Sequence, residues 1–167
     1  MADIDDQVTR IQQAWRRERP DLDVTAIGTI GRLHRLALAL TEELVVVYRA
    51  HGLSEGDFDV MAALRRAGEP YEASPSDLAA STMITSGGMS KRIDRLEGAG
   101  LVTRRVGSGD ARGRVIALTA EGKALIDAAF ADHVANEQRL LAMVPASERA
   151  ALEATLAGWL AHFEPRD

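Results

Sequence analysis

The chain has 167 residues, an apolar share of 46% and a charged share of 27%, which is the composition of a folded globular protein rather than a disordered one. It has no cysteine, which excludes disulfides, cysteine-ligated zinc and thiol nucleophiles, and no uncharged apolar run is long enough to cross a membrane. The acidic N-terminus lacks the apolar core of a signal peptide, and together these features are typical of a cytoplasmic protein.

The formal net charge of −5 is unevenly distributed along the chain. Between Ser86 and Ile116, seven cations stand against three anions, so this stretch carries a net +4 and the rest of the chain −9. A basic stretch in an acidic chain is typical of a surface that binds a polyanion such as nucleic acid. A solvated charged face is the alternative that charge alone leaves open.

Apolar residues spaced three and four apart predict two helices at the N-terminus. The first, at residues 3–19, carries one apolar stripe, formed by Ile4, Val8, Ile11 and Trp15. The second, at residues 24–50, contains Gly28 and Gly31 in its first half. Because glycine weakens an exposed helix, we expect these two positions to allow another helix to pack closely.

Helix-start signals place three short helices in the middle of the chain. A helix at residues 55–67 begins at the capping pair Ser54 and Asp57. The signal Ser-Pro-Ser-Asp opens a short helix at residues 74–81, and a further helix, at about 85–98, follows after a tight turn. Two short capped helices joined by a tight turn predict a helix-turn-helix.

Beyond this motif, the β-rich runs LVTRRV and GRVIALT flank the bend GSGDA and predict a β-hairpin. Thr119 caps a helix that runs to about Met143, and a last helix ends near Phe163. The predicted fold is mainly α with a small β-hairpin wing. We expect three regions: N-terminal helices at 1–50, a winged helix-turn-helix at 51–119 and C-terminal helices at 120–167.

The second helix of the helix-turn-helix has the features of a helix that enters the major groove of DNA. Its leading turn, TSGGMS, carries small side chains and free backbone N–H groups, which allow a close approach to base edges and phosphates. Lys91 and Arg95 lie one turn apart on its outer face. The alternative is an ordinary small-residue helix start beside a charged surface hairpin.

Arg92 lies on the inward stripe of the same helix, where the apolar residues are Met89, Ile93 and Leu96. The aliphatic stem of an arginine can cover apolar surface while its head reaches water, or the head can form a structural ion pair. A third interpretation is a guanidinium that points into a crevice behind the helix, where an anionic ligand can engage it through two hydrogen bonds.

The stretch DARGRVIALTAEG, at residues 110–122, and the preceding RIDRLEGAGLVTRR resemble the wing region of the MarR family of bacterial transcriptional regulators. The resemblance implies a homodimer held by its terminal helices, with one winged helix on each half of a pseudo-palindromic operator. It assigns Arg112 to the minor groove at the tip of the wing and Asp110 to holding the wing in shape. The predicted DNA-binding residues are Ser86, Ser90, Lys91, Arg95, Arg105, Arg112 and Arg114.

Within this family, the segments QQAWRRERPDLD, GDFDVMAALRRAG and SGGMSKRIDRLE are similar to the urate-responsive subgroup of PecS-, HucR- and MftR-like regulators. Four positions associated with ligand response map onto Trp15, Asp59, Arg92 and Arg104. The resemblance implies that Arg92 and Trp15 hold a planar purine anion. The charge of this anion then displaces Asp59 from an arginine partner, for which Arg104 is the candidate, and the recognition helix moves.

Each of these positions also has a purely structural explanation. Trp15 completes an apolar stripe, Asp59 lies near a helix start where the dipole favours an acid, and Arg104 could be one more phosphate contact. The chain also departs from the subgroup at Gly88 and Lys91, where Ala and Asn are usual, so the sequence leaves the base preference open.

Enzymatic function is not expected, because the chain has no nucleophile or phosphate-binding motif and its histidines are scattered at His34, His51, His133 and His162. We therefore expect no catalytic residue, cofactor or metal. The favoured function is a DNA-binding transcriptional regulator, most simply a repressor, that is released by urate or a related purine anion. The alternatives are a MarR-type sensor of phenolic or other aromatic compounds, controlling an efflux or stress gene, and a winged-helix module for protein–protein contact.

Overall fold

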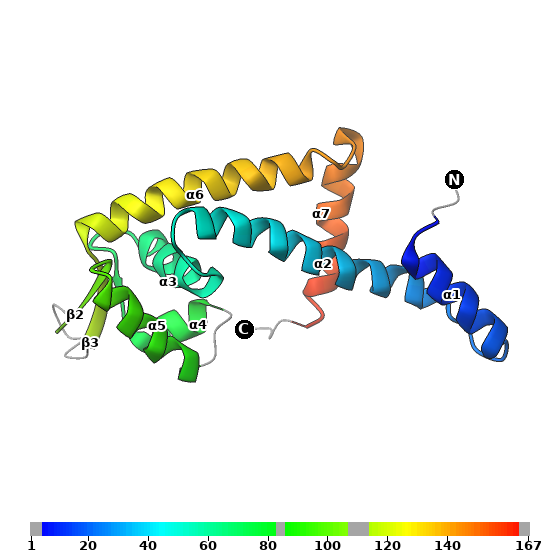
Figure 1. Ribbon diagram of the computed structural model, residues 1–167, viewed down its shortest axis with the longest axis horizontal. Coiled ribbons are helices and arrows are strands. Elements are labelled where there is room, and N and C mark those ends of the chain that lie inside the picture. Colours follow the sequence, from blue (N-terminus) through cyan, green and yellow to red (C-terminus); the bar gives the residue numbers. More distant parts are fainter. Residues whose placement is uncertain (1–4, 83–85, 107–113, 164–167) are drawn as a thin grey trace. The chain divides into compact units, whose positions relative to one another are not determined.

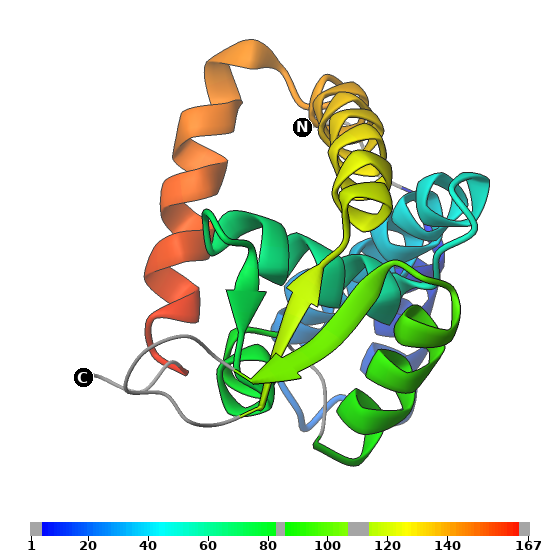
Figure 2. The same cartoon turned by 90° about the vertical axis from the view of Figure 1, so that its left-hand side faces the viewer.

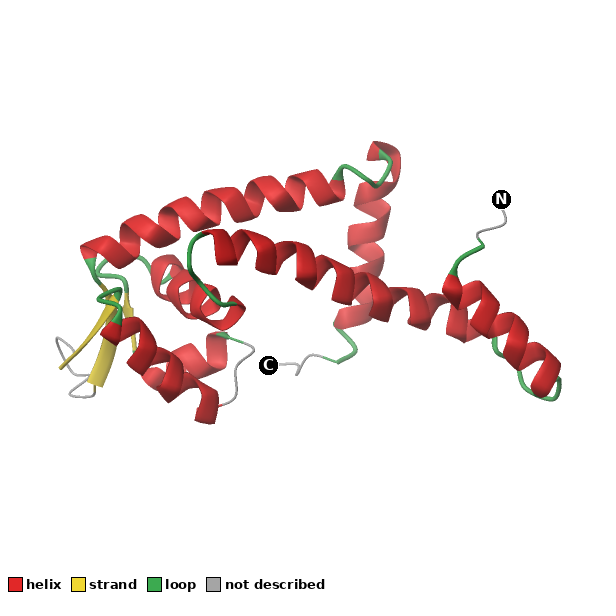
Figure 3. Ribbon diagram, in the orientation of Figure 1, coloured by secondary structure: helices red, strands yellow, loops and turns green. Residues whose placement is uncertain are grey.

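The computed structural model describes residues 5–82, 86–106 and 114–163, and it is mostly helical with one small antiparallel sheet (Figures 1 and 3). The helices are α1 Gln7–Glu18, α2 Thr25–Ala50, α3 Glu55–Arg66, α4 Pro75–Ser81, α5 Ser86–Gly98, α6 Ala120–Leu141 and α7 Ala146–Leu160. The strands are β1 Glu72–Ala73, β2 Val102–Val106 and β3 Arg114–Leu118. The predicted fold class is confirmed, and no described helix is long and apolar enough to cross a membrane.

The chain forms two compact units, Met1–Glu43 and Leu44–Asp167, and the boundary falls within α2. In the first unit, α1 packs closely on the start of α2, as the glycines predict. A Cβ atom at Gly31 would lie 3.1 Å from Val8 Cγ1, and one at Gly28 would lie 3.1 Å from the amide of Gln12. The buried Gln12 side chain donates hydrogen bonds to the carbonyls of Val24 and Thr25.

The expected start of the first helix, at residue 3, is wrong. Asp6 is the N-cap: its side chain accepts a hydrogen bond of 2.8 Å from Thr9 N–H, so α1 begins at Gln7. Asp6 also pairs with Arg32 of α2 at 2.8 Å, and this guanidinium lowers the pKa of Asp6 to about 2. Ile4, which we placed on this helix, lies outside the described residues.

The core of the second unit is formed by α3, α4, α5, α6 and the sheet. Met61, Leu64, Leu78, Leu96, Ile116 and Ile126 are its largest fully buried side chains. The inward stripe predicted for the fifth helix is confirmed, because Met89, Ile93 and Leu96 are all buried. This packing sets the direction in which the rest of α5 points.

The sheet has the strand order β1-β3-β2, and Figure 2 shows it beside α5. The predicted hairpin is confirmed: β2 pairs antiparallel with β3, with Val102 opposite Leu118 and Arg105 opposite Val115. Its bend, within residues 107–113, lies outside the described residues. The strand β1 was not predicted, because its two residues are too few to show a periodic pattern.

The predicted caps position the helix-turn-helix. Ser54 and Asp57 form a reciprocal capping box at α3, and Ser74 caps α4, with Pro75 as its first residue. Thr119 caps α6 by accepting from Gly122 N–H. The turn at residues 83–85, including Thr85, lies outside the described residues.

Candidate nucleic-acid interface and effector site

The exposed side of α5 carries two of the residues predicted to contact DNA. Ser90 and Lys91 are exposed, and no ion pair among the described residues includes Lys91. Arg114, at the start of β3, is also exposed and has no ion pair in the same set. Arg112 and the side chain of Ser86 lie outside what the structure describes, so their predicted roles stay predictions.

Arg95 binds the first turn of α3. It forms an ion pair with Asp57 and donates a hydrogen bond of 2.6 Å to Ser54 Oγ. Burial alone would raise the pKa of Asp57, but Arg95 and Ser54 stabilise its charge, so that pKa is lowered. Since 57% of the Arg95 side chain is exposed, the guanidinium holds α5 against α3 while it still faces solvent.

The next two arginines along the chain are paired with carboxylates as well. Arg104 forms ion pairs with Asp94 and Glu97, both on α5, and its backbone N–H donates to Glu97 at 3.2 Å. Asp94 chiefly raises the pKa of Arg104. Arg105 Nε donates to Glu72 at 2.8 Å. Arg104, the arginine that we expected to pair with Asp59, therefore pairs with α5 instead.

Arg92 lines a hollow on the surface between α5 and the start of α3. We call this the cationic hollow; its volume is about 480 Å³, and its lining residues are Ser54, Gly88, Lys91, Arg92 and Arg95. Arg92 is half-buried and takes part in no ion pair among the described residues, so the structural ion pair considered for it is absent from that set. Three cations around one hollow favour an anionic occupant.

Asp59 lies within the electrostatic reach of Arg92. Burial and then the charge of Glu55 raise the pKa of Asp59, and Arg92 is the leading cation that opposes them. Arg66 and His133 lower the same pKa to a smaller extent. The structure thus brings together two of the four predicted effector residues, Arg92 and Asp59, through charge rather than through an ion pair.

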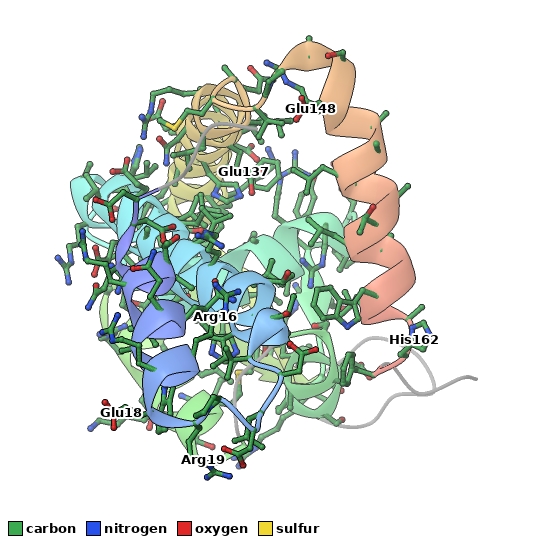
Figure 4. The ribbon with its side chains drawn as sticks, turned by 90° about the vertical axis from the view of Figure 1, so that its right-hand side faces the viewer. Arg16, Glu18, Arg19, Glu137, Glu148 and His162 are labelled. Atoms are coloured by element: carbon green, nitrogen blue, oxygen red, sulfur yellow. The ribbon has the colours of Figure 1, made fainter. Side chains whose placement is uncertain are left out.

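Trp15, the third, belongs to the first unit. It lies in the last turns of α1 with 49% of its surface exposed, and its carbonyl accepts from Arg19 N–H. Arg16, Glu18 and Arg19, labelled in Figure 4, follow it in the chain, where α1 ends at Glu18 and Arg19 is the C-cap. An indole exposed to this extent is available for stacking, which the packing-anchor explanation does not require.

The part of the site at the start of α3 was not predicted from the sequence. Ser54 and Asp57 were identified as a cap, but their contact with Arg95 joins residues 41 and 38 positions apart and leaves no local pattern. Gly56, between them, had a visible signal, because a glycine inside the first turn of a helix is unfavourable unless something requires it.

Comparisons with known proteins bear on the family and the fold of the chain. A family model described as the MarR family matches residues 51–113, which include α3, α4, α5 and β2. The chain is 42% identical to the HTH-type transcriptional regulator PecS of Dickeya dadantii strain 3937 over 150 residues, which cover 90% of each protein.

Two solved structures are similar over most of the chain. AbsC, a MarR family transcriptional regulator from Streptomyces coelicolor, is 26% identical with a TM-score of 0.73, covering 85% of this chain and 97% of AbsC. CouR from Rhodococcus jostii RHA1, solved bound to p-coumaroyl-CoA, is 26% identical with a TM-score of 0.66, covering 76% and 88%. PecS and AbsC are transcriptional regulators, which confirms the prediction that the chain is not an enzyme.

Proposed function

The chain belongs to the MarR family of DNA-binding transcriptional regulators, and we propose that it binds a pseudo-palindromic operator as a homodimer and is released by urate or a related purine anion. The observation that carries this proposal is the cationic hollow, because Arg92 lines it and also lies on α5, the helix predicted to read DNA. An anion bound there changes the charge and the position of that helix at once. The division into terminal dimerisation helices and a central winged helix remains part of the proposal.

The proposed DNA surface consists of exposed groups on α5 and β3. Lys91 and Arg114 offer charges that no described carboxylate neutralises, whereas Arg95 and Arg105 must share theirs with Asp57 and Glu72. Lys91 and Arg114 therefore supply most of the phosphate attraction on the described surface, and the paired arginines fix the helix and strand in place.

Replacing Arg112 by alanine is expected to weaken operator binding about three- to tenfold. The substitution removes a positive charge that is proposed to lie in a narrow minor groove. Fluorescence anisotropy on the upstream DNA, measured across a salt series, checks this. Binding must weaken steeply with salt, since phosphate counterions are released. Unchanged affinity in Arg112→Ala would remove this residue from the DNA surface, and salt-independent binding would favour a protein-interaction module.

The proposed dimer rests on α7, which leaves an apolar face uncovered by the described part of the chain. None of its residues is buried, although Leu152, Leu156, Trp159 and Leu160 lie on one face. This face borders a groove of about 670 Å³ that Leu141 of α6 also lines. An apolar helix face of this kind favours a second copy of the chain as its occupant, because the same face on the copy supplies a matching surface.

Leu156→Glu is expected to raise the dissociation constant of the dimer at least tenfold, because a carboxylate in an apolar interface lacks its hydration. The fold of the protomer should survive, since 43% of Leu156 is already exposed. Analytical ultracentrifugation checks the change, with Ala154→Glu on the opposite face of α7 as the matched control. Equal dissociation constants for the two variants would show that this face is not the interface.

The proposed effector mechanism follows from the charges around Arg92. An anion in the cationic hollow attracts the guanidinium and withdraws it from Asp59, whose charged form burial already disfavours. A ligand weakens DNA binding only if it prefers one conformer, and a site on the recognition helix supplies that preference. Trp15 stays a predicted stacking partner of the purine ring, by resemblance to the subgroup.

A phenolic or other aromatic effector is the second candidate. It is favoured by the similarity to CouR, which was solved with p-coumaroyl-CoA bound. The two candidates differ in the part played by Arg92, because a neutral aromatic compound gains nothing from a guanidinium fork.

A further inference from the structure

Gly56 is buried in the first turn of α3, directly under the head of Arg92. A Cβ atom at this position would overlap the Cζ and Nε atoms of Arg92 and press on its Nη2 atom. The guanidinium therefore occupies the space that any other side chain at position 56 would fill.

The backbone does not explain this glycine. Gly56 lies outside the left-handed region, in contrast to Gly52, Gly68 and Gly100, whose φ values are near 70 to 80°. Alanine is the better helix former and could adopt the same conformation. What position 56 requires is space, and Arg92 is the group that uses it.

This contact differs from the other glycine contacts of the second unit. A Cβ atom at Gly122 would collide with the backbone of Leu101, so substitution there would disturb the fold. At Gly56 the colliding atoms are the far end of a flexible side chain, so α3 can keep its place while the guanidinium moves away. Gly98 and Gly158, also helical, have no atom within 4 Å of an added Cβ.

The space left by Gly56 determines which charged groups lie near the Arg92 guanidinium. The guanidinium lines the cationic hollow, and its charge acts on Asp59, which lies three residues after Gly56 on α3. Moving the guanidinium out of this space changes its distance to the hollow and to Asp59.

We propose that Gly56 is a positioning residue of the effector site, whose missing side chain seats the Arg92 guanidinium where it can exchange Asp59 for a bound anion. This inference rests on the proposed function and adds a residue to it. Gly56 touches no ligand; it acts through Arg92.

The test measures urate-dependent release from operator DNA for Gly56→Ala, Arg92→Ala and the double variant, with Gly98→Ala as the matched control. Gly56→Ala should raise the urate concentration for half-release at least tenfold, bind DNA within twofold of the unsubstituted protein and unfold at the same temperature or higher. In the Arg92→Ala background, Gly56→Ala should add less than a twofold change, because the residue it acts through is gone. A normal urate response in Gly56→Ala, or an equal added effect without Arg92, would overturn the proposal.

A second readout does not depend on urate. The ¹⁵Nε–¹Hε NMR resonance of Arg92 should shift in Gly56→Ala and stay in place in Gly98→Ala. If urate fails to release the unsubstituted protein, the proposed function is wrong, whereas an unshifted Arg92 resonance in Gly56→Ala shows that Gly56 does not seat Arg92.

Discussion

Arg92→Ala is expected to bind operator DNA within about twofold of the unsubstituted protein and to need roughly 10- to 100-fold more urate for release. A hydrogen bond to a charged group contributes about 1.5–3 kcal/mol, which corresponds to that range of ligand affinity. DNA binding should survive because the exposed cations Lys91 and Arg114 are untouched. Anisotropy titrations of urate against the protein–DNA complex measure both quantities.

Two further variants separate charge from shape at this position. Arg92→Lys keeps the charge but loses the planar fork, so its response should lie between those of the unsubstituted protein and Arg92→Ala. Arg66→Ala removes another cation that acts on Asp59 but lies outside the cationic hollow, and it should release normally. If Arg92→Ala is released at the same urate concentration as the unsubstituted protein, Arg92 does not bind the effector, and its aliphatic stem only covers apolar surface on α5.

Asp57→Ala is expected to lower the free energy of unfolding by about 2–3 kcal/mol. It removes half of the capping box of α3, which contributes about 1 kcal/mol, and a charge-assisted bond to Arg95, which contributes about 1.5–3 kcal/mol. The expected total is smaller than the full sum of about 2.5–4 kcal/mol because Arg95 is more than half exposed and solvent screens its charge. Denaturant unfolding measures the change, and operator affinity should fall with it, since Arg95 holds α5 against α3.

The contribution of Asp57 depends on pH in a defined direction. Its folded-state pKa is lowered, so the stabilisation is present above the ordinary aspartate value of about 3.9 and is lost as the pH falls through the folded-state pKa. The stability difference between the unsubstituted protein and Asp57→Ala should therefore shrink below about pH 4.

Asp77 provides the control for this prediction. It occupies the same third position of a capped helix, α4, and accepts from Ser74 Oγ at 2.7 Å, but it forms no ion pair among the described residues. Asp77→Ala should lose about 1 kcal/mol at most. If the two variants are equally destabilised, the ion pair between Arg95 and Asp57 adds nothing to the free energy of unfolding.

The parts of the fold that follow from neighbouring residues could be predicted from the sequence. The caps at Ser54, Ser74 and Thr119 satisfy backbone groups within three residues, and the inward stripe of α5 follows from helical spacing. The predicted start of α1 was too early because an apolar stripe does not show which residue caps the helix. That residue is Asp6.

The partners of the arginines could not be predicted, because they depend on tertiary packing. Arg95 reaches Asp57 across 38 positions and Arg105 reaches Glu72 across 33. Composition identified the basic stretch correctly but counted charges that the fold neutralises in pairs. The consequence is functional: Lys91 and Arg92, which form no ion pair with any described residue, contribute more to anion binding than the net +4 of the stretch suggests.

The most direct measurement is a titration of urate into the unsubstituted protein bound to its own upstream DNA at physiological salt. We expect binding as a dimer and release at sub-millimolar urate. Release by a neutral phenol but not by urate would identify a phenolic sensor instead. A complex that persists at saturating urate would contradict the proposal that the hollow around Arg92 receives a purine anion.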